Sequence, residues 1–196
     1  MKANRMLIAL FIMLLATCYT GVLHASDPAQ KLKQASYLFD QQRRSFPAER
    51  LIQEALAQYE ETSDEIGLAN AYLTYGFFFR SEAAELSRKT YEKYGFMDKT
   101  PYSERLSKSI EYFDRAKSIF EGRSDLPHVV HIEYNKAFTY KIMGDTAKAC
   151  DAFDESVRAS ERASESDAGY NPALPDGFVS FSAFVSAQKD RVPCEP

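Results

Sequence analysis

The chain contains an internal repeat: the stretch that begins at Ala55 recurs 61 residues later, beginning at Ala116. The two stretches, ALAQYEETSD and AKSIFEGRSD, agree in a small residue, an aromatic residue and a closing Ser-Asp pair. The matched positions are Ala55 and Ala116, Tyr59 and Phe120, Glu60 and Glu121, Ser63 and Ser124, and Asp64 and Asp125. A fixed period is the sequence signature of a stacked-repeat protein, so we expect this chain to offer a surface to a partner rather than to house chemistry.

Three helix pairs can be aligned along the chain, over residues 29–62, 69–122 and 130–163. Each pair shows the same order of residue types: small, aromatic, small, large apolar, small. The aligned sets are Ser36, Phe39, Ala48, Ile52 and Ala55; Gly76, Phe79, Ser109, Phe113 and Ala116; and Ala137, Tyr140, Ala149, Phe153 and Ser156. This spacing, with Gly144-Asp145 as the turn of the third pair, predicts an all-α fold.

The second pair carries an insertion of 21 residues, which we place at 82–101. The distance between the two small residues is 12 in the outer pairs but 33 in the middle one, from Gly76 to Ser109. The first part of the insertion continues as helix, and the stretch from Gly95 to Pro101 must then turn. One interpretation is a solvated loop between overlong helices. The other is a projecting contact site, because the segment contains Tyr91, Tyr94, Phe96 and Met97.

The aligned pattern resembles the tetratricopeptide repeat, whose signature is W-x2-L-G-x2-Y followed by A-x3-F. The resemblance covers about residues 29–163 and implies a right-handed α-α superhelix of three helix pairs, with a domain over 26–167. Two charged residues, Glu133 and Lys136, depart from it because they stand where apolar residues are usual. The Ser-Asp pairs at 63–64 and 124–125 are typical of Asp caps on the next helix.

The tail after Asp167 differs from the repeats, since four Gly and Pro residues between 169 and 177 interrupt any fourth pair. The run after it places Phe178, Phe181 and Val185 on one helical face. We therefore predict a C-terminal capping helix within 168–196, which would cover the apolar face of the last repeat. A strand is the alternative, because the run is rich in Phe and Val.

The first 25 residues read as an export signal, with Lys2 and Arg5 followed by an apolar run of 12 residues from Met6 to Thr17. We expect cleavage after Ala25 and a periplasmic protein. The alternative is a bacterial lipoprotein signal that ends before Cys18, which would then carry the lipid and anchor the protein to the envelope. A retained membrane helix is disfavoured because the run is shorter than the roughly 20 residues that span a bilayer.

The net charge of the chain limits the classes of partner that it can bind. The formal net charge is −4, and cleavage would remove Lys2 and Arg5 but no acid, which leaves −6. This balance argues against nucleic acid as the partner, and against a membrane partner except through lipidation at Cys18.

Cys150 and Cys194 are the cysteines left after cleavage, and an oxidising compartment favours a disulfide between them. Two unrelated thiols are the alternative.

The resemblance implies a concave face lined by the first helix of each pair, and that face is where we predict a peptide or protein partner. The position after each small residue is aromatic: Tyr37, Phe77 and Phe138. Aromatic side chains bury apolar groups at low entropic cost, and polar neighbours can bind a backbone or carboxylate. The neighbours in the same register are Lys33, Leu73 and Tyr134; Gln34, Thr74 and Asn135; and Asp40, Arg80 and Lys141. The alternative role of the three aromatics is packing between repeats.

The predicted partner-binding residues combine this face with the insertion. They are Tyr37, Phe77, Arg80, Tyr134, Asn135, Phe138, Lys141, Tyr91, Tyr94 and Phe96. The expected function is that of an envelope adaptor, assembly factor or chaperone, with a protein or peptide as partner. An alternative is an exported immunity or inhibitor protein that blocks an envelope-acting toxin or enzyme through the insertion.

An enzyme is a further alternative, and it would depend on His128 and His131. Their spacing could place two metal ligands on one helical face, but no nearby cysteine completes a set. We expect them to be solvated residues at a helix start. The sequence has neither a Gly-rich phosphate loop nor a strand-turn motif that presents a nucleophile. We therefore expect no enzymatic activity, cofactor or metal.

Overall fold

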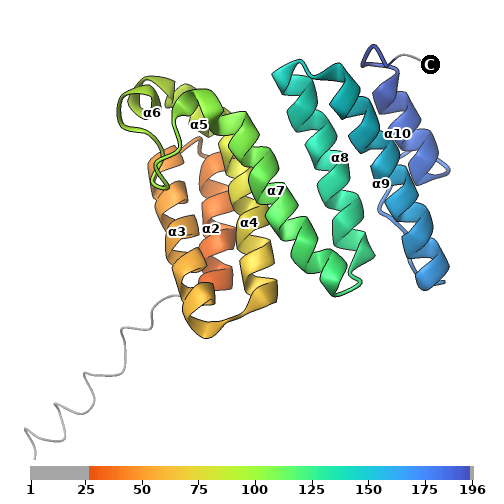
Figure 1. Cartoon of the computed structure of the whole chain (residues 1–196), viewed down its shortest axis with the longest axis horizontal. Coiled ribbons are helices and arrows are strands. Elements are labelled where there is room, and N and C mark those ends of the chain that lie inside the picture. The colour runs from red at the N-terminus through yellow and green to blue at the C-terminus, as the bar shows by residue number, and fades with distance from the viewer. Residues whose placement is uncertain (1–26, 195–196) are drawn as a thin grey trace, which may run out of the picture.

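The computed structural model describes residues 27–194, and all regular structure within them is helical, as predicted (Figure 1). The signal sequence, the cleavage site after Ala25 and the lipidation candidate Cys18 lie outside the described residues. No helix within 27–194 is long and apolar enough to cross a membrane. The helices are α2 (Pro28–Asp40), α3 (Ser45–Thr62), α4 (Glu65–Arg80), α5 (Glu82–Leu86), α6 (Arg88–Tyr94), α7 (Arg105–Gly122), α8 (Leu126–Met143), α9 (Thr146–Ser166) and α10 (Phe181–Lys189), with a 3-10 turn η2 (Tyr102–Glu104) before α7.

The long helices pack as three pairs, α2 with α3, α4 with α7, and α8 with α9, which follow one another along the molecule (Figure 1). Gly76 shows why the register needs a small residue: a Cβ atom there would lie 2.7 Å from the ring of Phe113. At the same crossing, the Ser109 hydroxyl donates a hydrogen bond of 2.7 Å to the Gly76 carbonyl. The aligned residues Gly76, Ser109 and Phe113 therefore form the close contact within the second pair.

The predicted aspartate caps are present at the starts of the first helices of the second and third pairs. Asp64 accepts a hydrogen bond of 2.9 Å from the Gly67 amide, and Asp125 accepts one of 3.4 Å from the His128 amide. The preceding serines adopt left-handed backbone conformations, with φ of 54° at Ser63 and 58° at Ser124. The repeated Ser-Asp pair is thus a helix-to-helix turn followed by an N-cap.

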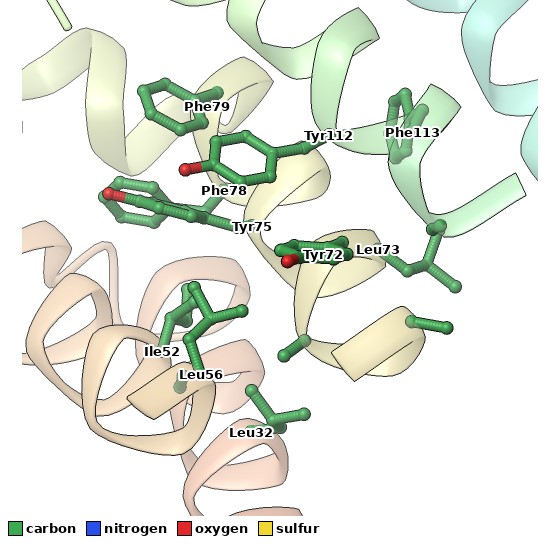
Figure 2. Close-up of a cluster of buried hydrophobic side chains, with 14 of the residues drawn as sticks. Leu32, Ile52, Leu56, Tyr72, Leu73, Tyr75, Phe78, Phe79, Tyr112 and Phe113 are labelled. Atoms are coloured by element: carbon green, nitrogen blue, oxygen red, sulfur yellow. The ribbon is translucent and has the colours of Figure 1, made fainter. Parts of the chain in front are cut away.

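A large aromatic core fills the first two pairs (Figure 2). Tyr75 lies at its centre, with its ring centroid 4.6 Å from that of Phe79 and 4.7 Å from that of Tyr112. A second apolar cluster joins α8 and α9 to α10. These clusters hold the helices in register because closely packed side chains leave little room for sliding.

The charged residues that depart from the repeat pattern form an ion-pair network between α7 and α8. Glu133 is buried and lies 2.7 Å from the Lys117 ammonium, while Lys136 lies 2.7 Å from Asp114. Lys136 also lies 3.2 Å from Glu133, so the two pairs are linked. Charge complementarity therefore links α7 to α8 at the positions where the sequence pattern led us to expect apolar residues.

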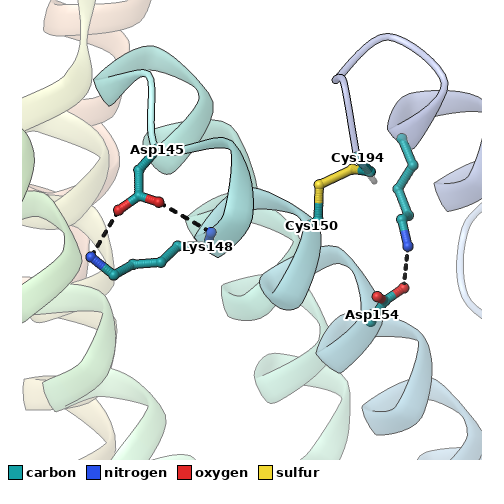
Figure 3. Close-up of a disulfide and its surroundings, with 6 residues drawn as sticks. Asp145, Lys148, Cys150, Asp154 and Cys194 are labelled. Carbon is teal, nitrogen blue, oxygen red and sulfur yellow. Dashed lines mark hydrogen bonds and ion pairs between the residues drawn. A yellow bond between two sulfur atoms is a disulfide. The ribbon is translucent and has the colours of Figure 1, made fainter. Parts of the chain in front are cut away.

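The tail folds as predicted, with α10 packed against α9, and the strand alternative is wrong. Cys150 and Cys194 form a disulfide, as expected, with a Cα–Cα distance of 5.8 Å (Figure 3). Lys189 of α10 adds an ion pair of 2.6 Å to Asp154 of α9. The end of the chain is therefore fastened to the last repeat helix both covalently and electrostatically.

Candidate functional site

Arg80, the last residue of α4, bridges to α8 through neutral acceptors. Its guanidinium donates hydrogen bonds of 2.7 Å to the Asn135 carbonyl and 2.6 Å to the Asn135 side-chain oxygen, and one of 3.4 Å to Thr139. The carbon of the guanidinium lies 4.9 Å from the Phe77 ring centroid and 5.6 Å from that of Phe113. Arg80 is thus held in place by hydrogen bonds on one side and aromatic rings on the other.

The positive charge of Arg80 has no ion-pair partner among residues 27–194. Burial lowers the pKa of Arg80 to about 10, and the charge of Asp40 opposes that shift. Burial likewise raises the pKa of Asp40, against the charge of Arg80, although the two groups do not approach within ion-pair distance. Of the five N–H donors of the guanidinium, two have no hydrogen-bond acceptor in the described part of the chain. The guanidinium therefore has hydrogen-bonding capacity beyond its neutral partners.

His131 borders Arg80 on α8. Its ring centroid lies 5.6 Å from that of Phe77. The pKa of His131 is lowered mainly by burial, and to a smaller extent by the positive charges of His128 and Arg80. His131 and Arg80 both lie against the Phe77 ring, which brings the three side chains together. We call the surface formed by Asp40, Phe77, Arg80, His131 and Asn135 the Arg80 face.

His128 does not join this face and has local partners instead. Its Nδ1 lies 2.8 Å from Asp125 Oδ1, and its ring stacks on Phe120 with centroids 4.2 Å apart. In the described residues, no group of three or more His, Cys, Asp or Glu side chains could hold a metal ion. His128 thus contributes to the start of α8, whereas His131 lies beside Arg80.

The predicted aromatic row divides into one exposed residue and two packing residues. Tyr37 is 56% exposed on α2. Phe77 and Phe138 are half-buried, and each meets the phenylalanine of its partner helix edge-on, with centroids 5.2 Å apart for Phe77 and Phe113 and 5.4 Å apart for Phe138 and Phe153. The row therefore does not form a continuous groove lining, because two of its members face the partner helix.

Two other predicted contact residues are engaged inside the protein. The Asn135 side chain is buried; its oxygen accepts from Arg80 and its nitrogen donates to the His131 carbonyl. Tyr134 packs against Phe181 and Phe184 of the capping helix, with centroids 6.1 and 5.4 Å away. Both residues hold the scaffold together, while Lys141 is exposed at the far end of α8.

The insertion does not project from the stack as a loose apolar loop, which corrects the prediction for Tyr91 and Phe96. Both side chains are buried, with 2% and 1% exposure, and they stack with centroids 4.0 Å apart. The predicted continuous helix is broken at Ser81 and Ser87 into α5 and α6, so the segment folds back onto the first pair. Tyr94 is 67% exposed and stays available to a partner.

Glu49 is the buried anchor of the insertion, and the repeat pattern gave no sign of it. Its carboxylate accepts hydrogen bonds of 2.9 Å from the Tyr75 hydroxyl, 3.0 Å from the Tyr91 hydroxyl and 2.6 Å from the Met97 amide. Burial raises its pKa, those hydrogen bonds oppose the shift, and the charge of Asp98 adds to it. This carboxylate, which forms no ion pair with any residue of 27–194, is thus stabilised by three donors.

Comparisons with protein-family models, with curated proteins and with solved structures found no match for this chain.

Proposed function

We propose that this chain is a tetratricopeptide-like protein, with a right-handed stack of its three helix pairs, that binds a protein or peptide partner in the bacterial cell envelope. Its role would be that of an adaptor, assembly factor or chaperone. The Arg80 face would hold an acidic group of the partner, either a side chain or a terminal carboxylate. The observation that carries this proposal is a guanidinium that has only neutral partners and keeps two N–H donors free among the described residues.

An anion beside the Arg80 guanidinium is favoured for two physical reasons. A charge-assisted hydrogen bond to a guanidinium is about twice as strong as a neutral one. An incoming carboxylate would also compensate the desolvation that lowers the pKa of Arg80. Tyr37 lies one helical turn before Asp40 on α2 and offers an exposed aromatic ring on the same side.

The disulfide supports a location outside the cytosol, because disulfides form and persist in oxidising compartments. An export signal in residues 1–25 is consistent with this location and stays part of the proposal.

The proposal is tested by crosslinked capture of the partner from the envelope, followed by measurement of its affinity for purified variants. We expect Arg80→Lys and Tyr37→Ala each to weaken binding by about tenfold, because the first loses the planar fork and the second an exposed aromatic anchor. Arg191→Gln, a change at a remote exposed cation, should leave the affinity unchanged. Tyr37 is exposed, so its variant should fold normally; unchanged binding by both site variants would exclude the Arg80 face.

A further inference from the structure

The insertion and the start of α3 together form a second exposed surface, at the place where α6 and the following loop lie beside α3 (Figure 1). Three large apolar side chains are exposed there: Phe46 at 49%, Tyr94 at 67% and Met97 at 50%. Contacts made by neighbouring residues place these three side chains in the same region of the surface. Phe46 lies 5.2 Å from the Tyr91 ring, and the Met97 amide bonds Glu49, one turn after Phe46 on α3.

Three cations are close to these apolar groups in sequence, although the chain as a whole is acidic: Arg44 precedes Phe46, Lys93 precedes Tyr94 and Lys99 follows Met97. Arg44, Lys93 and Lys99 are exposed and form no ion pair within residues 27–194. The ammonium of Lys93 lies 4.8 Å from the Tyr94 ring centroid, so charge and apolar surface are interleaved. We call Phe46, Tyr94, Met97, Arg44, Lys93 and Lys99 the insertion patch.

The loop that carries Met97 and Lys99 is held firmly by its own hydrogen bonds. The Phe96 amide donates 3.0 Å to the Thr100 carbonyl, and the Lys99 amide donates 2.9 Å to the Phe96 carbonyl. Asp98 accepts bonds of 3.0 Å from the Thr100 amide and 3.1 Å from the Tyr112 hydroxyl of α7. A partner would therefore meet a loop whose backbone is already positioned, which lowers the entropic cost of binding.

We propose that the insertion patch is a docking surface for an acidic segment of a protein partner that also carries apolar side chains. This inference goes beyond the Arg80 face, since it uses different residues and needs no ligand there. Acidic side chains would meet the unpaired cations, while apolar ones would cover Phe46, Tyr94 and Met97. Exposed apolar groups gathered within a polar rim are typical of protein interaction sites.

Charge argues against the other occupants. A second copy docked through the same patch would bring Arg44, Lys93 and Lys99 against their own counterparts, since a two-fold interface pairs like surfaces. An anionic bilayer would attract these cations but repel the chain as a whole, whose formal net charge is −4. A discrete acidic segment can pair with the cations without approaching the rest of the acidic surface.

The test is selection from a library of random linear peptides on the purified mature chain. We expect enrichment of peptides that combine Asp or Glu with Leu or Phe, and a loss of their affinity by about tenfold or more in Arg44→Glu/Lys93→Glu/Lys99→Glu. The matched control, Arg123→Glu/Lys148→Glu/Arg191→Glu, uses three exposed cations outside both proposed surfaces, changes the net charge equally and should keep the binding. Tyr94→Ser/Met97→Ser should also weaken it, and circular dichroism should show that each variant is folded.

The remaining outcomes overturn the proposal. These are no enrichment of acidic peptides, equal loss in the matched control, patch-dependent binding to phosphatidylglycerol vesicles in place of the peptides, or a dimer in sedimentation velocity that the patch variant abolishes. Arg80→Lys should leave the selected peptides bound, so that failure of the Arg80 face and failure of the insertion patch give different results.

Discussion

The Tyr91 hydroxyl donates a hydrogen bond of 3.0 Å to Glu49 Oε2, and this bond fastens the insertion to the first helix pair. Tyr91→Phe removes the donor and leaves a buried carboxylate with one bond fewer. We expect a loss of about 1.5–3 kcal/mol in the free energy of unfolding, the range for hydrogen bonds to charged groups, measured by chemical denaturation. Tyr94→Phe is the control, because the Tyr94 side chain is exposed, and its stability should match the wild type within about 0.5 kcal/mol. Equal stabilities of the Tyr91 and Tyr94 variants would contradict the anchoring role.

Glu49 should make the stability depend on pH. Its pKa in the folded protein is raised, mainly by burial, so the folded state takes up a proton at a higher pH than the unfolded state does. The wild type should therefore gain stability relative to Glu49→Gln as the pH falls from neutral through the raised pKa, and the gain should level off below the ordinary value of 4.5. The measurement is urea unfolding of both proteins across this range. A difference that stays constant with pH would refute the assignment.

Gly76 should not tolerate a methyl group. A Cβ atom would lie 2.7 Å from the Phe113 ring, so Gly76→Ala forces α4 and α7 apart. Overpacking should lower the free energy of unfolding by about 1–3 kcal/mol, while the better helix propensity of alanine should raise it by about 1 kcal/mol. Gly122→Ala is the matched control, because nothing lies within 4 Å of the added atom, and this variant should be as stable as the wild type or more so. Thermal unfolding of the two variants separates the effect of steric crowding at Gly76 from the effect of helix propensity, which both variants share.

The disulfide closes a loop with a sequence separation of 44 residues. Cys150→Ser/Cys194→Ser should lower the free energy of unfolding by about 4 kcal/mol on the chain-entropy model. Without the disulfide, α10 is held to α9 by noncovalent contacts alone, such as the Lys189–Asp154 ion pair, so we expect hydrogen exchange by local opening to rise most in residues 181–194 of the variant. Exchange that rises equally in α2 would show that the disulfide stabilises the whole chain and not the tail alone.

The repeat geometry was predictable because it depends on local periodicity. Small residues at Gly76 and Ser109 mark the place where two helices touch, and Asp64 and Asp125 mark where helices begin, whatever lies farther away. The candidate site was only partly predictable. The sequence predicted Arg80 as a contact residue, but its hydrogen bonds to Asn135, 55 residues away, depend on how α8 is placed against α4. The packing within each pair, α4 with α7 and α8 with α9, places Phe77 and Phe138 against the phenylalanine of the partner helix.

The sequence by itself determined the all-helical architecture, because that follows from the spacing of small and aromatic residues along the chain. It favoured the capping helix over a strand and the disulfide over two unrelated thiols, because of residue chemistry. Only the tertiary structure decided the path of the insertion and the charge pairing of Glu133 with Lys117. The reason is that burial is a property of neighbours in space. Glu49 looks like any helix-surface glutamate until Tyr75, Tyr91 and Met97 converge on it from two other segments, and this convergence is what separates buried Tyr91 from exposed Tyr94.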